Sequence, residues 1–218
     1  MAKISYEVMK KMLRIERYRE IAKYDEVVDR GVDAMWGDLC KNITDHNIDP
    51  TDIYDDELEN LKDTKYSMKL MNICLLSETW EQDLYNFLKE KGLLEVYSND
   101  YKFTKRAFEQ AYPTCAISRY PVIEEMRALV NAIKHGEGNA LQNIRRLTSD
   151  NILADSNIGI VDENGVVTKR KEIEFDNSTL TSRTLNVEGK LKLYSEAIVS
   201  FWEDVYTADN PANDSTEM

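Results

Sequence analysis

Apolar side chains recur at helical spacing through most of this chain, and this periodicity restricts it to a helical fold. Within residues 70–91, one arc of a helical wheel gathers the large apolar residues Ile73, Leu76, Trp80, Leu84, Phe87 and Leu88, with Ser77 and Glu81 inside or beside it. Glycine and proline, which interrupt helices, supply only 8 and 4 of the 218 residues. We therefore expect an all-α bundle of about six to seven helices.

The expected helices have defined ranges, which are 6–23, 25–43, 55–91, 104–111, 121–135, 140–147 and 189–206. Residues 158–168 change to a strand-like pattern around Asn164-Gly165, which predicts a β-hairpin insertion over 157–176. One helical domain should thus occupy residues 1–206, followed by a flexible acidic tail over 207–218.

The first predicted helix has one apolar side, which should face the core. That side carries Val8, Met9, Met12, Leu13, Ile15, Tyr18 and Ile21. Its other faces are basic, with Lys10, Lys11, Arg14, Arg17 and Arg19.

The negative charge of the chain is concentrated in two segments. The net charge is −12, of which −7 lies in residues 45–63 and −6 after Lys192, so the remaining body is near neutral. This balance argues against loose, non-specific nucleic-acid binding but permits a local basic site. We interpret 45–63 as a solvated acidic loop; Pro50 stands where a calcium loop needs glycine.

Two further features bear on the cellular compartment. No run of 18 apolar residues occurs, so we expect no membrane span, and the N-terminal residues lack the pattern of a signal peptide. Cys40, Cys74 and Cys115 show no metal-binding spacing and are expected to be reduced core thiols. A cytoplasmic protein without a metal or other cofactor is predicted.

The helix predicted over 121–135 carries the most chemistry. Its polar arc holds Glu124, Arg127, Asn131, Lys134 and His135, opposite an apolar face. Two cations, an amide and an imidazole suit an anion such as phosphate, and a histidine can transfer a proton near neutrality. The alternative is an ordinary amphipathic helix with a solvated polar side, on which His135 caps the C-terminus.

Other charged residues could support this arc. Glu78 and Glu81, on the predicted helix of Trp80, could hold its cations, because a carboxylate at the edge of an apolar stripe needs a partner. Arg145 and Arg146, at the end of the next short helix, could contribute to substrate binding.

The run Arg127 to Gly138, R-A-L-V-N-A-I-K-H-G-E-G, resembles the signature helix of HEPN-type all-helical domains. Leu185, Val187, Tyr194 and Phe201-Trp202 are similar to the C-terminal part of uncharacterised bacterial proteins with an N-A-I-K-H-G-like helix. The resemblance extends over about residues 70–206, and its specific part is the dozen residues of the helix.

This resemblance implies a metal-independent ribonuclease, or an RNA- or nucleotide-binding effector, of a bacterial toxin–antitoxin or phage-defence system. It also implies a homodimer in which two such helices form one cleft, with RNA and an antitoxin or other protein as partners. His135 would act as general acid or base while the RNA 2′-hydroxyl attacks the adjacent phosphate. Asn131 would position the phosphate, and Arg127 or Lys134 would stabilise its charge.

The arginine departs from the family pattern, in which Arg directly precedes the polar residue. Val130 occupies that position, and Arg127 lies eight residues before His135, about 12 Å along a helix. A binding-only relative is therefore an open alternative: a non-catalytic helical protein that uses the same helix for dimerisation or as a partner surface. A carboxylate-metal bundle is disfavoured because Glu-x-x-His motifs are absent.

Overall fold

The fold consists of packed α-helices. The computed structural model describes residues 5–46, 54–94, 100–135, 159–161, 167–169 and 187–209. These residues contain α1 (Tyr6–Ile21), α2 (Tyr24–His46), α3 (Tyr54–Glu90), α4 (Tyr101–Ala111), α5 (Pro121–His135) and α7 (Lys190–Asp209). The short 3₁₀ turns η2 (Pro113–Cys115) and η3 (Ile117–Arg119) connect α4 to α5. The prediction of an all-α helical bundle is confirmed.

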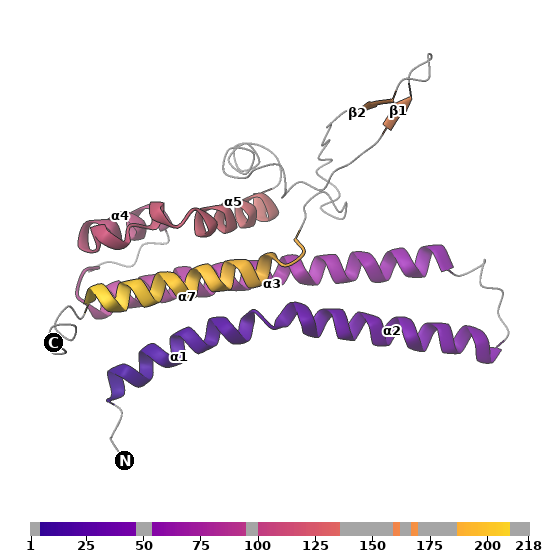
Figure 1. Cartoon of the computed structure of the whole chain (residues 1–218), viewed down its shortest axis with the longest axis horizontal. Helices are drawn as coiled ribbons and strands as arrows, with labels where there is room; N and C mark the ends of the chain where they lie inside the picture. Colours follow the sequence, from indigo (N-terminus) through magenta and orange to yellow (C-terminus); the bar gives the residue numbers. More distant parts are fainter. Residues whose placement is uncertain are drawn as a thin grey trace, which may run out of the picture.

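The helices form three layers around α3 (Figure 1). α1 and α2 follow one another along one side, α3 and α7 lie in the middle, and α4 and α5 lie on the other side. α3 is much longer than α7, and its first half continues beyond α7 beside α2. α3 therefore contacts both outer layers and is the central element of the bundle.

The core forms where the apolar faces of α3, α5 and α7 meet. The predicted stripe of α3 is buried along its whole length, from Ile73 to Leu88. The face of α7 predicted from the sequence is also buried, with Leu191, Tyr194, Ile198, Phe201, Trp202 and Val205 fully enclosed. Each such side chain contributes about 1.5–3 kcal/mol by leaving water. These two faces confirm the helical periodicity.

Capping interactions explain why α3 ends close to its predicted position and why α4 begins earlier than predicted. α3 stops where predicted because Gly92 adopts a φ of +69°, and the Leu93 N–H donates to the Leu88 carbonyl at 2.9 Å. α4 starts three residues before the prediction, since the Asp100 carboxylate accepts from the Lys102 N–H at 2.9 Å.

Helical structure extends further into the acidic segment and the C-terminal tail than predicted. α2 continues through His46 and α3 begins at Tyr54, so an acidic loop over the whole of 45–63 is wrong. α7 continues to Asp209, because the Asp209 carboxylate accepts from Lys91 at 2.7 Å and from Tyr112 at 3.0 Å. The prediction of a tail from residue 207 is wrong for its first three residues.

The expected inner face of α1 is confirmed at Tyr18 and Ile21 but is wrong in the first half of the helix. Its buried residues are Arg14, Tyr18 and Ile21, while Val8, Met9, Met12 and Leu13 are all exposed. The physical reason is that α1 packs against polar groups of α3 and α7, which attract Arg14 rather than a methionine.

Two short strands, β1 (Gly159–Val161) and β2 (Val167–Lys169), pair antiparallel with Ile160 opposite Thr168. The predicted Asn164-Gly165 turn lies outside the described residues, as do the predicted helix 140–147 and residues 210–218. The hairpin insertion over 157–176 therefore stays a prediction. Among the described helices, none is long and apolar enough to cross a bilayer.

Asp209 links the stability of this bundle to pH. Partial burial acts to raise the pKa of Asp209, but Lys91, Tyr112 and Lys11 outweigh it and lower the pKa below its usual value. Its stabilising effect is therefore complete above the unfolded-state pKa of about 3.9 and lost as pH falls through the lower folded-state pKa. We expect wild type to exceed Asp209→Asn in unfolding free energy at neutral pH, and this gap to shrink below about pH 4.

Urea titrations of both proteins between pH 7 and pH 3 measure this gap. Asp38→Asn, on an exposed part of α2, is the control for loss of one negative charge. A gap that stays constant down to pH 3 would contradict the role of Asp209.

Candidate functional site

α5 is held so that its polar arc points away from the core. Pro121 occupies the first turn, where a missing N–H costs nothing. Ile123, Met126 and Leu129 are fully buried against α3 and α7. The opposite side therefore presents Arg127 and Asn131, which are partly exposed, and Lys134, which is exposed.

Arg127 is tied to neighbouring helices. Its Nε donates to Glu81 Oε1 of α3 at 2.8 Å, and its guanidinium lies over the ring of Tyr101 of α4. Only 15% of the Arg127 side chain is exposed, compared with 37% for Glu81. The ion pair and the cation–π contact thus fix this side chain between three helices.

Lys134 forms a second pair with α3. Its Nζ donates to Glu78 Oε1 at 2.6 Å. This hydrogen bond raises the pKa of Lys134, so the amine remains charged at neutral pH. The predicted partnership of the two cations with Glu81 and Glu78 is confirmed as a pair of contacts.

The remaining candidate residues are only partly described. Asn131 lies one turn from both Arg127 and Lys134 on the same side of α5. His135 is the last residue of α5, and its side chain is not among the described ones. Arg145 and Arg146 lie outside the described residues. The structure therefore brings together Arg127, Asn131, Lys134, Glu78 and Glu81, and leaves the other three untested.

This arrangement has little spare positive charge. Each described cation of the arc is balanced by one carboxylate, so a phosphate bound beside Arg127 would have to displace or approach Glu81. Because both pairs link α5 to α3, they also hold α5 in place. The geometry suits a structural connection and an exposed polar surface better than an anion-binding cleft.

A buried ionic cluster joins α1, α3 and α7, and sequence reasoning missed it. Asp83 is 5% exposed and accepts from the Tyr18 hydroxyl at 2.7 Å and from Arg17 at 3.2 Å. The Nε of Arg14 lies 3.8 Å from Asp83, and its Nη1 donates to the Tyr206 hydroxyl at 2.7 Å. Burial and the Asp83 charge raise the pKa of Tyr18, which stays a donor. The available signal was Asp83 itself, an acid at the edge of the apolar stripe of α3.

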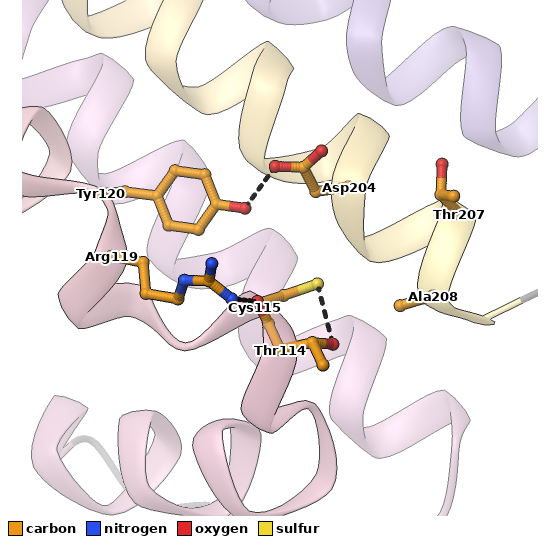
Figure 2. Close-up of a pocket in the computed structure, with 7 residues that line it drawn as sticks. All are labelled: Thr114, Cys115, Arg119, Tyr120, Asp204, Thr207 and Ala208. Atoms are coloured by element: carbon orange, nitrogen blue, oxygen red, sulfur yellow. Dashed lines mark hydrogen bonds between the residues drawn. The ribbon is translucent and has the colours of Figure 1, made fainter.

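A surface hollow of about 450 Å³ lies between the 3₁₀ turns and the end of α7 (Figure 2). The Tyr120 hydroxyl donates to Asp204 at 2.6 Å across it, and Arg119 donates to the Thr114 carbonyl. Its polar groups thus bond to one another, which indicates a seam between elements rather than a ligand pocket. Among the described residues, no group of three or more His, Cys, Asp or Glu side chains could hold a metal.

Comparison of the chain with protein-family models, with curated proteins and with solved structures gives no match.

Proposed function

We propose that this protein is a HEPN-like helical interaction protein that works by binding and not by cleaving RNA. The observation that carries the proposal is the pairing of Arg127 and Lys134 with Glu81 and Glu78 on α3. A phosphoryl-transfer site needs a cation aimed at the developing negative charge. Here the arginine is held by a carboxylate and an aromatic ring instead.

The exposed surface of α5 is then a contact surface. Asn131 and Lys134 offer hydrogen bonds on a rigid helix whose other side is packed in the core. We propose that a second copy of the chain binds there, forming a homodimer, and that the bacterial toxin–antitoxin or phage-defence setting implied by the resemblance supplies further protein partners. We also propose that the protein is cytoplasmic and that residues 157–176 form a β-hairpin insertion in the helical domain.

A metal-independent ribonuclease is the second candidate. It is favoured by the placement of Arg127, Asn131 and Lys134 on one side of α5, next to the helix end at His135. In that case RNA would have to draw Arg127 away from Glu81 when it binds.

RNA cleavage separates the two candidates. We expect wild-type protein and the His135→Ala variant alike to leave labelled single-stranded RNA intact in EDTA. Cleavage by wild type that His135→Ala and Arg127→Ala both abolish would overturn the binding proposal and establish the ribonuclease.

Self-association is tested separately by analytical ultracentrifugation. We expect Asn131→Arg to raise the dimer dissociation constant about tenfold or more, because a bulky charge at an interface centre is costly. Gln110→Arg, on an exposed position of α4, is the matched control and should leave association unchanged. A monomeric wild type, or equal association of both variants, would contradict dimerisation through α5.

A further inference from the structure

The first half of α1 turns its apolar side away from the rest of the bundle. Tyr6, Val8, Met9, Met12 and Leu13 lie within one arc of about 160° on the helix and are termed here the outer face of α1. Their exposed fractions are 69%, 48%, 46%, 58% and 61%. An amphipathic helix normally buries its apolar side, so this face indicates a contact that a single chain does not make.

The inner side of α1 explains why its apolar side is left free. Arg14 donates to the Tyr206 hydroxyl of α7 at 2.7 Å, and the Tyr18 hydroxyl donates to Asp83 of α3 at 2.7 Å. Both Arg14 and Tyr18 are buried by these contacts. The outer face therefore cannot turn inwards unless buried polar bonds are broken, which is costly.

The area of the outer face is sufficient for a contact between two chains. Its side chains expose on the order of 500 Å² of mainly apolar surface, as large as the biggest patches on monomeric proteins. Two such faces in contact would bury on the order of 1,000 Å², which is the lower limit for a specific interface. We therefore expect a weak dimer instead of an obligate one.

The apolar residues of α1 are arranged symmetrically along the helix. About the midpoint between residues 10 and 11, each has an apolar counterpart at the same distance on the other side. The pairs are Met9 with Met12, Val8 with Leu13, and Tyr6 with the half-buried Ile15. A two-fold axis at this midpoint, perpendicular to the helix, makes two α1 helices antiparallel and places the members of each pair opposite each other. This self-complementary pattern favours a second copy of the chain as the partner.

The charges near the midpoint do not oppose such a contact. Lys10 Nζ lies 2.6 Å from Glu90 at the end of α3. Lys11 Nζ lies 4.0 Å from Asp209 and 4.8 Å from the ring centroid of Tyr206, both on α7. Both lysines are thus directed to the inner side and paired there, so the outer face between residues 6 and 13 carries no charged side chain.

We propose that a second copy of the chain binds the outer face of α1, with the two α1 helices antiparallel. This contact does not depend on the proposed function of α5. Because α5 lies in the opposite outer layer of the bundle, the two contacts do not compete (Figure 1). A chain that makes both contacts can assemble beyond a dimer.

Analytical ultracentrifugation of the Asn131→Arg variant tests the α1 contact apart from the proposed α5 contact. We expect this variant still to dimerise, and an added Met12→Lys to raise the dissociation constant about tenfold or more, because each lysine would be buried without a partner. Met35→Lys replaces a methionine of α2 that is similarly exposed, at 55%, and should leave association unchanged.

Two results would overturn the α1 contact. One is a monomeric Asn131→Arg variant at about 100 μM, and the other is equal association of the Met12→Lys and Met35→Lys variants. A dimer that Asn131→Arg leaves intact and Met12→Lys dissociates would instead refute the α5 contact and support the α1 contact.

A disulfide tests the antiparallel arrangement. Val8→Cys and Leu13→Cys are made in separate chains in which Cys40 and Cys74 are serine and Cys115 is alanine. Residue 8 of one chain then lies opposite residue 13 of the other, while the two copies of residue 8 are about 7.5 Å apart along the axis alone, too far for a disulfide.

We expect mild oxidation of an equal mixture to give a disulfide-linked dimer that dithiothreitol reverses, and each chain alone to stay unlinked. Disulfides within each single preparation would indicate parallel helices and overturn the proposed arrangement. The absence of any disulfide in the mixture would overturn it as well.

Discussion

Replacing Asp83 with alanine is expected to lower the free energy of unfolding by about 3–5 kcal/mol. The carboxylate is buried and faces Arg14, Arg17 and Tyr18, so its removal leaves the guanidinium of Arg14 without its charge partner. Arg14 is itself only 7% exposed, and water cannot replace the lost interaction there. Chemical denaturation by urea, followed by circular dichroism, measures the loss.

Glu16→Ala is the matched control for Asp83→Ala. Glu16 pairs with Arg19 on the surface of α1, and both side chains are more than half exposed. Such pairs contribute little, so the control should stay within about 0.5 kcal/mol of wild type. Equal effects of the two substitutions would show that the buried cluster does not stabilise the bundle.

Replacing Trp202 with alanine is expected to cost about 3–5 kcal/mol as well. The indole is fully buried on α7, with ring centroids 5.4 Å from Phe87 and 5.7 Å from Tyr206. The Arg14 guanidinium lies 4.6 Å from the ring centroid, so a cation–π contact is also lost. Thermal and urea unfolding of the variant measure the cost.

The control for Trp202 is the half-buried Trp36 of α2, whose replacement by alanine should cost clearly less. Because Asp83 and Trp202 both contact Arg14, the double variant should differ from the sum of the single ones by 0.5 kcal/mol or more. Strict additivity would argue against an energetic connection through Arg14.

The helical core could be predicted from the sequence because burial there follows a simple period. Trp80 in α3 and Tyr194 in α7 lie at positions that a helical wheel assigns to the inside, and both are buried. The same rule failed for the first half of α1, since it assumes that the inner face is the apolar one, whereas Arg14 is buried there and Met12 is exposed. There the long-range cluster of Arg14, Asp83 and Tyr206 decides which side of α1 is buried. Its partners are 65 or more residues apart in the chain, so no local sequence pattern predicts their contact.

In the candidate site, too, the local spacing could be predicted from the sequence and the long-range contacts could not. The spacing of Arg127, Asn131 and Lys134 alone predicted that they share one face of α5. The cost of burying a carboxylate predicted that Glu81 needs a partner. The stacking of Arg127 on Tyr101 could not be foreseen, because it depends on where α4 lies. The helix ends at Asp100 and Asp209 were displaced for a similar reason, since both depend on side-chain hydrogen bonds. Asp100 accepts one from the Lys102 N–H, and Asp209 accepts two, from Lys91 and Tyr112.

The unequal lengths of α3 and α7 divide the bundle into regions of different rigidity. Glu188 meets Lys69 where α7 is about to begin, so the earlier part of α3 has α2 as its neighbour within the described chain. There Val32, Trp36 and Leu39 are only half-buried. Separation of α2 from the first half of α3 exposes far less apolar surface to water than global unfolding does. The backbone amides of this extension should therefore undergo hydrogen exchange through local opening, whereas the amides around Trp80 should exchange only when the whole domain unfolds.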